Sequence, residues 1–323
     1  MNYPFSDPNR IRNTPVWACV LLLIGFWAIA QLVTMPFVMP LIVPATRSGE
    51  DIEPFAQMLV ILISLVVTFV TMAGLTLAWA KRVEGRQLAD LGLIFTATGW
   101  AQYRRGLAVG GLFTVGLILL VTLLTVLSGF GEISANDPAQ NVVHWDRLAD
   151  PTLWLILLVL GLAIAIQGAA EEILCRGWLL SNVTALRGLP IGFLLSMLMF
   201  ASLHPHYLFV DGFSVSPAQM LTGLFGMAAI LGMGAMLAML AIADRSIMGA
   251  CGLHSGFNYS AITIALLVII LSSDEPNAVH AFVQSFKQST DLTAVQPALV
   301  FQFLLSALVA FFLFRRFGFP RAG

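Results

Sequence analysis

Two adjacent glutamates, Glu171 and Glu172, stand inside an apolar stretch that reads EEILCR through Arg176. A carboxylate at the centre of a membrane helix costs about 2.5–3.5 kcal/mol on insertion scales. Such groups persist where they face a protein interior or an aqueous cavity, and by default they mark function. A glutamate in this setting can take up and release a proton, which is what acid–base catalysis needs.

The two glutamates are not equivalent on a helix. Adjacent residues point about 100° apart, so they need not share a task. Glu172 and Arg176 are i, i+4 neighbours, and Arg176 can neutralise Glu172. Glu171 is then the carboxylate left for proton transfer. The alternative interpretation is a charged helix end at the membrane surface, where both glutamates would be ordinary interfacial residues.

Two later apolar stretches end or begin with histidine. FASLH ends at His204, and HSGFN runs from His254 to Asn258, which lie one turn apart on one helix face. Solvation at a helix end would explain His204 alone, and a helix–helix hydrogen bond would explain Asn258 alone. Together with Glu171 these residues predict one polar site built from three helices. The short span that ends at His204 must then lie deep in the bundle.

Composition predicts the elements that position these residues. The chain of 323 residues is 59% hydrophobic and 10% charged, whereas soluble domains are about 25% charged. It therefore predicts an all-α, polytopic transmembrane helical bundle of about eight spans, forming a single integral-membrane domain over residues 1–323. The motif-bearing core covers about 150–270. The expected spans are 16–43, 55–80, 106–130, 152–182, 190–204, 217–242, 247–271 and 297–314.

The distribution of charge predicts the orientation of the bundle. All but Arg47, Arg147 and Lys287 of the 16 lysine and arginine residues fall on one side of this layout. By the positive-inside rule both termini are cytoplasmic, and we expect an integral membrane protein of the bacterial inner membrane. Residues 81–105 read as a basic connection that anchors this side. The net charge of −1 gives no sign of nucleic-acid binding.

The ordered motifs EExxxR, FxxxH and HxxxN resemble the CPBP family of intramembrane proteases, which includes the type 2 CAAX prenyl proteases and Abi-type proteins. The resemblance implies a glutamate-dependent endopeptidase that acts on a peptide or membrane-associated protein substrate. It implies that Glu171 is the general base, that His204 helps it to polarise a water, and that His254 and Asn258 stabilise the oxyanion. Glu172 and Arg176 match supporting positions.

Other site chemistries stay open at this point. The same four Glu and His side chains suit zinc, but the chain has no HExxH motif or other compact zinc spacing, so no cofactor is expected. A proton-coupled transporter or a non-catalytic membrane scaffold would use the same buried carboxylates. Ser202 and Ser255 lack the surroundings of a nucleophile.

Overall fold

The computed structural model describes residues 12–48, 52–127, 143–204, 217–272, 278–290 and 296–317, and these residues contain no β-strand. The predicted all-α bundle is confirmed. Its α-helices are α1 (Val16–Ser48), α2 (Pro54–Ile63), α3 (Phe69–Arg82), α4 (Ala97–Leu127), α5 (Pro151–Glu172), α6 (Ser181–Arg187), α7 (Leu189–Ser202), α8 (Pro217–Asp244), α9 (Met248–Ser272), α10 (Ala278–Thr290) and α11 (Gln296–Phe317).

Four shorter helical segments connect or interrupt these helices. The π-helical segment η1 (Ser64–Thr68) joins α2 to α3, and a second one, η5 (Ile173–Leu180), joins α5 to α6. The 3₁₀ turns are η2 (Leu88–Leu91) and η4 (Trp145–Ala149). π-helical turns often occur at functional sites. Because η5 begins directly after Glu172, the segment around Glu172 is a candidate functional site.

Within the described residues, seven helical stretches are long and apolar enough to cross a membrane, and they correspond to seven of the predicted spans. The remaining predicted span, 190–204, is the 14-residue helix α7. At 1.5 Å per residue α7 is about 21 Å long, less than the hydrocarbon core of about 30 Å. The helix α10 was not predicted. It is amphipathic and short, and it packs Phe282 into a cluster with α5 and α9.

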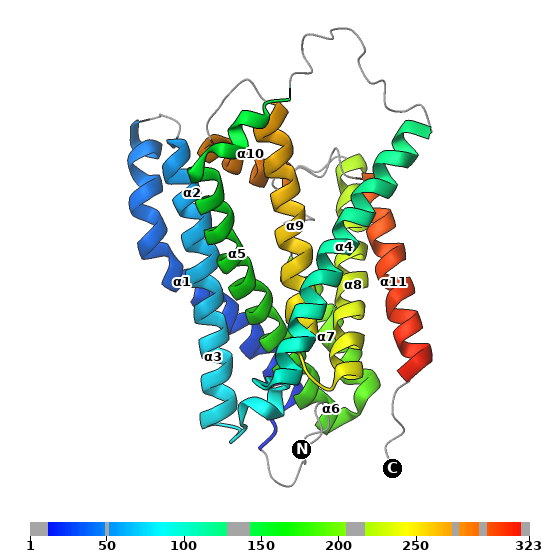
Figure 1. Cartoon of the computed structure of the whole chain (residues 1–323). Helices are drawn as coiled ribbons and strands as arrows, with labels where there is room; N and C mark the ends of the chain where they lie inside the picture. The colour runs from blue at the N-terminus through cyan, green and yellow to red at the C-terminus, as the bar shows by residue number, and fades with distance from the viewer. Residues whose placement is uncertain are drawn as a thin grey trace.

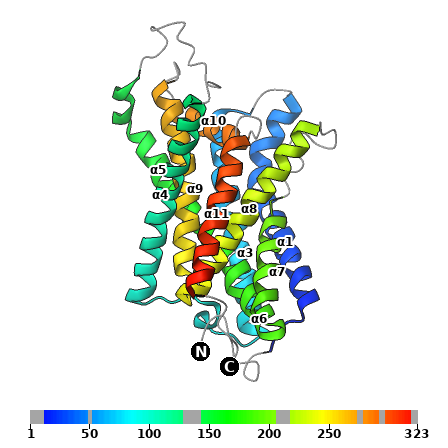
Figure 2. The ribbon, with the colours of Figure 1, turned by 90° about the vertical axis from the view of Figure 1, so that its right-hand side faces the viewer.

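The bundle has two sides that meet at α9. The helices α1, α2, α3 and α5 form one side, and α4, α8 and α11 form the other (Figure 1). The helix α9 packs against both α4 and α5. After a quarter turn, α11 lies in front of the bundle and beside α8, its main partner (Figure 2).

One end of the bundle carries most of the basic residues, and we call it the basic end. The end of α3, the start of α4, the helix α6 and the end of α11 all lie there (Figure 1). These segments hold Lys81, Arg82, Arg104, Arg105, Arg187, Arg315 and Arg316. The clustering agrees with the charge bias that the sequence predicted.

Glycines bring the backbones of α4 and α9 into direct contact. A Cβ at Gly106 would meet the carbonyl oxygen of Gly249, and a Cβ at Gly252 would meet the carbonyl oxygen of Tyr103. In lipid, helices associate through close packing, and small residues permit the approach. The contact fixes the position of α9, the helix that carries the HxxxN motif. By contrast, a Cβ added at Gly116 on α4 would have nothing within 4 Å.

We expect Gly252→Ala to destabilise the protein by about 1–3 kcal/mol, because the added methyl group overpacks a backbone contact. Thermal unfolding in detergent measures this. The matched control Gly116→Ala should leave the melting temperature unchanged or raise it, since alanine is the better helix former. Equal melting temperatures for the two variants would contradict the assigned contact.

Candidate active site

The helix that carries both glutamates changes character along its length. It begins at Pro151, where the Asp150 side chain accepts a hydrogen bond from the Thr152 amide (2.8 Å). Its first turns present Leu155 and other apolar side chains to the exterior. From residue 170 to residue 184 every residue is buried, and the helix continues beyond Glu172 through η5 and α6. The interpretation of the glutamates as an exposed helix end is therefore wrong.

Glu172 is fully buried and charge-paired. Arg176 Nη1 lies 2.8 Å from Glu172 Oε1, which is the predicted i, i+4 pair. The same oxygen lies 3.0 Å from Nδ1 of His254 on α9. Arg176 extends the contacts further, because its Nη2 donates to the carbonyl oxygen of Gly234 on α8 (3.1 Å) and its guanidinium lies 4.2 Å from the ring centroid of Phe200 on α7.

Glu171 has a different environment from its neighbour. Its side chain is also buried, and its Oε1 lies 3.5 Å from Gln167 Nε2, one turn earlier on the helix. Its Oε2 lies 3.7 Å from His254 Nε2 and makes no hydrogen bond in the described part of the chain. His254 therefore stands between the two carboxylates, with Nδ1 toward Glu172 and Nε2 toward Glu171.

His204 reaches the site through Phe200. His204 Nδ1 lies 2.9 Å from the Phe200 carbonyl oxygen, and the two rings are 5.0 Å apart. The Phe200 ring also contacts the His254 ring edge-on at 5.7 Å. Phe200 is itself buried, so the end of α7 lies inside the bundle, as the site required. Of the two histidines, His254 is therefore the one beside the Glu171 carboxylate, at 3.7 Å.

Asn258 lies one turn beyond His254 on α9 and is half-buried. Its side chain makes no hydrogen bond to another described residue, so the structure does not join it to the glutamates. The two serines considered as nucleophiles bond to backbone carbonyls of their own helices. Ser255 Oγ donates to Cys251 O (2.8 Å), and Ser202 Oγ donates to Met199 O (2.8 Å).

Sequence reasoning missed three contributors to the site. Gln167 stands one turn before Glu171, and its i, i+4 spacing was a usable signal. Phe200 opens the FxxxH motif, but nothing in the pattern indicated that its ring would contact two histidines and an arginine. The Gly234 carbonyl that accepts from Arg176 could be found only from the packing of α8.

A close approach of α5 and α9 brings His254 to the glutamates. A Cβ at Gly168 would lie 2.7 Å from Oγ of Ser255, the residue after His254. The same Cβ would lie 3.2 Å from the Ser255 backbone nitrogen, so a side chain at 168 requires Ser255 to shift. Gly168 therefore matters for the geometry of the site even though it has no chemistry of its own.

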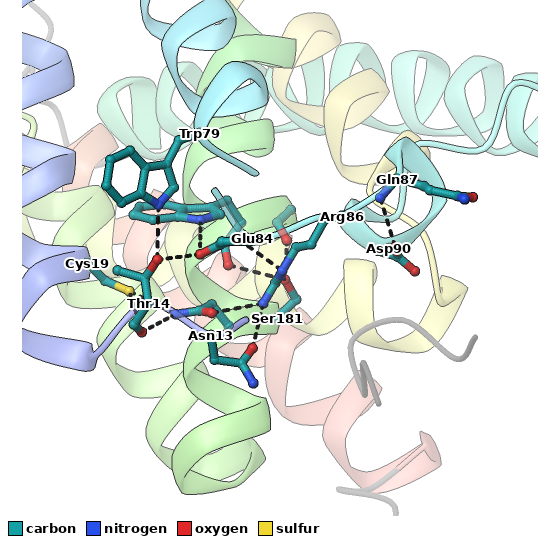
Figure 3. Close-up of polar contacts among 12 residues, drawn as sticks. Asn13, Thr14, Cys19, Trp79, Glu84, Arg86, Gln87, Asp90 and Ser181 are labelled. Carbon is teal, nitrogen blue, oxygen red and sulfur yellow. Dashed lines mark hydrogen bonds and ion pairs between the residues drawn. The ribbon is translucent and has the colours of Figure 1, made fainter. Parts of the chain in front are cut away.

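A second buried polar group, which we call the clamp cluster, holds the other end of the glutamate-bearing helix (Figure 3). Arg86 Nε pairs with Glu84 Oε2 at 3.0 Å, and both side chains are buried. Arg86 also donates to Ser181 Oγ (2.7 Å) and Asn182 Oδ1 (2.9 Å) on α6. Glu84 Oε1 accepts from Trp178 Nε1 (3.0 Å) on η5.

The clamp cluster also reaches the start of α1. Glu84 Oε1 accepts from Thr14 Oγ1 at 2.6 Å, and Asn182 Nδ2 donates to the Thr14 carbonyl oxygen at 2.7 Å. Burial lowers the pKa of the Arg86 guanidinium, while the charges of Glu84 and Asp90 act in the opposite direction. The sequence placed Arg86 in a basic connection and gave no sign that its side chain is buried; in the structure Arg86 is only 3% exposed.

The comparison with known families bears on the same region. Residues 151–260 match the family model described as type II CAAX prenyl endopeptidase Rce1-like. The chain carries an Rce1-like region. This confirms the resemblance to CPBP-type intramembrane proteases that the three motifs indicated, and all the motif residues lie within the match. The match supports a CAAX-protease-like intramembrane endopeptidase at the level of the family. No curated protein and no solved structure matches the chain.

We expect Arg86→Gln to lower the free energy of unfolding by about 3–5 kcal/mol, because it leaves Glu84 buried without its counter-charge. The matched control is Arg82→Gln, four residues earlier and exposed at the end of α3, which should change stability by less than about 0.5 kcal/mol. Denaturation in detergent compares the two variants. Similar losses in both would mean that the clamp cluster does not hold the helix.

Proposed function

We propose that this protein is a glutamate-dependent intramembrane endopeptidase in which Glu171 activates the attacking water. The single observation that supports this most is the asymmetry of the two carboxylates. Glu172 is neutralised by Arg176, whereas Glu171 Oε2 is left beside His254 Nε2 at 3.7 Å. A base with an uncommitted oxygen next to a polarisable hydrogen-bonding group is the arrangement that general base catalysis needs.

The proposed reaction assigns one step to each group. Glu171 takes a proton from water as the water oxygen bonds to the scissile carbonyl carbon. The carbonyl oxygen becomes negative, and His254 in its imidazolium form donates to it through Nε2–H, while its Nδ1–H donates to Glu172. Protonated Glu171 then gives its proton to the leaving nitrogen as the C–N bond breaks. His204 and Asn258 are proposed to help at the water and at the oxyanion, respectively.

A metal is not part of this proposal, and the reason lies in the donor set. Zinc would take its ligands from Glu171, Glu172, His204 and His254. Glu172 Oε1 is already paired with Arg176, whose positive charge opposes a cation at the same oxygen. Among the described residues, no three His, Cys, Asp or Glu side chains are grouped as a metal site.

The proposal also covers the domain organisation, the location in the cell and the substrate class. We propose a single integral-membrane domain over residues 1–323 with its catalytic core at about 150–270. The protein would lie in a bacterial inner membrane with both termini cytoplasmic, which reporter fusions at each terminus can test. The substrate would be a peptide or a membrane-associated protein. The printed family name makes a prenylated CAAX peptide, paired with its unprenylated counterpart, the first choice of test substrate.

We expect Glu171→Gln to reduce cleavage by about 10²–10⁴-fold, because the amide cannot accept the proton of water. Two measurements test this: cleavage of the synthetic CAAX peptides, and the set of peptides released from membranes that contain either the wild-type protein or the variant. Glu53→Gln, an exposed carboxylate before α2, is the matched control and should cleave normally. Unchanged melting temperature of Glu171→Gln shows that the loss is chemical. Full cleavage by a folded Glu171→Gln protein would contradict the assignment of Glu171 as the base. Absence of cleavage by the wild-type protein as well would instead favour a transporter or a scaffold.

Removal of metal ions should leave activity intact. We expect purified, active protein to contain less than stoichiometric zinc by elemental analysis, and chelation should not reduce cleavage. Loss of zinc in step with loss of activity, with recovery of both on adding zinc, is the outcome that contradicts a metal-free reaction.

A further inference from the structure

A pocket of about 420 Å³ lies at the basic end, between the start of α1 and the end of α3. Its volume is within the range of about 300–1,000 Å³ that is typical of small-molecule sites. It is separate from the glutamate site and is not used by the proposed reaction. Most of its lining is apolar. The lining residues are Arg12, Asn13, Thr14, Pro15, Trp17, Ala18, Leu21, Leu22, Trp79, Val83 and Glu84.

The apolar wall of the pocket continues onto the outer surface of the bundle. Trp17 is 69% exposed and Leu21 is 60% exposed, and both lie on the first turns of the membrane-spanning helix α1. In a membrane such a surface contacts acyl chains. Tryptophan is enriched at the level of lipid headgroups, so Trp17 and Trp79 place the pocket at that level.

Two polar residues of the pocket wall, Thr14 and Glu84, already have hydrogen-bond or ion-pair partners for their side chains, whereas the guanidinium of Arg12 has none within the described part of the chain. Glu84 is neutralised by Arg86, and Thr14 donates to Glu84 and accepts from Trp79 Nε1 (3.0 Å), as Figure 3 shows. Glu84 therefore does not repel an anion. Arg12 is exposed, and its guanidinium has no partner among the described residues. The uncommitted charge of the pocket is thus positive.

The start of α1 adds a second attraction for an anion. Pro15, the residue before the helix, has no side-chain acceptor, and the side-chain oxygens of Asn13 and Thr14 already accept from Arg86 and Trp79. The first turn contains no acidic residue. Helix N-termini with free amides bind phosphate groups. Two of the residues concerned, Trp17 and Ala18, line the pocket.

We infer that this pocket binds one anionic phospholipid of the surrounding leaflet. Its phosphate lies between Arg12 and the start of α1, and an acyl chain lies against Leu21 and Leu22. The combination of a cationic rim, a phosphate-binding helix end and an apolar wall open to lipid selects this occupant. The inference does not depend on protease activity, so binding measurements test it independently of the proposed function.

The test uses the full chain in detergent with added phosphatidylglycerol or phosphatidylcholine, and it measures lipid binding by native mass spectrometry and melting temperature. We expect phosphatidylglycerol to bind and to raise the melting temperature more than phosphatidylcholine does. Arg12→Gln should weaken phosphatidylglycerol binding about 5-fold, the ratio expected for one basic residue near anionic lipid. The matched control Arg104→Gln, exposed at the same end, should bind like the wild type.

A second pair of variants tests the pocket itself. Ala18→Phe fills it and should abolish the preference for phosphatidylglycerol, whereas Ala28→Phe, on the exposed face of the same helix, should keep it. Three results would overturn the inference: equal binding of the two lipids, equal weakening by Arg12→Gln and Arg104→Gln, or unchanged binding in a folded Ala18→Phe protein. Equal stabilisation by inorganic phosphate alone would also overturn it, since a free-anion site needs no lipid.

Discussion

The buried carboxylate of Glu172 is the constraint on which the rest of the bundle depends. An unpaired charge in a protein interior costs several kcal/mol, and here it is answered from two directions by Arg176 and His254 at the same oxygen. Arg176 in turn contacts Phe200 and Gly234. One charge therefore links η5 with α7, α8 and α9. Satisfying it sets the relative positions of the helices that surround Glu171.

Backbone contact between helices makes this pairing possible. An imidazole is short, so His254 reaches both carboxylates only if α9 lies close to α5, and Gly168 permits that distance. On its other face α9 touches α4 through Gly106 and Gly252. Lipid supplies no hydrophobic force between helices, so close packing and polar contacts must hold them. The glycines and the Glu172 pairing thus stabilise the same arrangement.

What could be predicted from the sequence was local or compositional. Hydropathy alone predicted the seven long spans. Helical periodicity predicted the Glu172–Arg176 pair, because residues four apart are neighbours on any helix. The ordered motifs also indicated three helices whose residues contact one another in the structure, through Glu172, Phe200 and His254. That His254 rather than His204 lies beside Glu171 could not be predicted, because it depends on how α7 and α9 pack in the bundle. The short length of α7 was predicted, whereas the packing of α10 does not follow from hydropathy alone.

Arg86 shows why counting charges along the sequence does not reveal the environment of a charged residue. Arg82 and Arg86 lie four residues apart after the same span, and each contributes equally to the positive charge of that side. Arg82 is exposed, whereas Arg86 is buried against Glu84, Ser181 and Asn182. Its partners come from segments about 95 residues later in the chain as well as from two residues away. A charge is buried where distant partners can satisfy it, so its environment is decided by tertiary packing, even though its side of the membrane is decided by sequence.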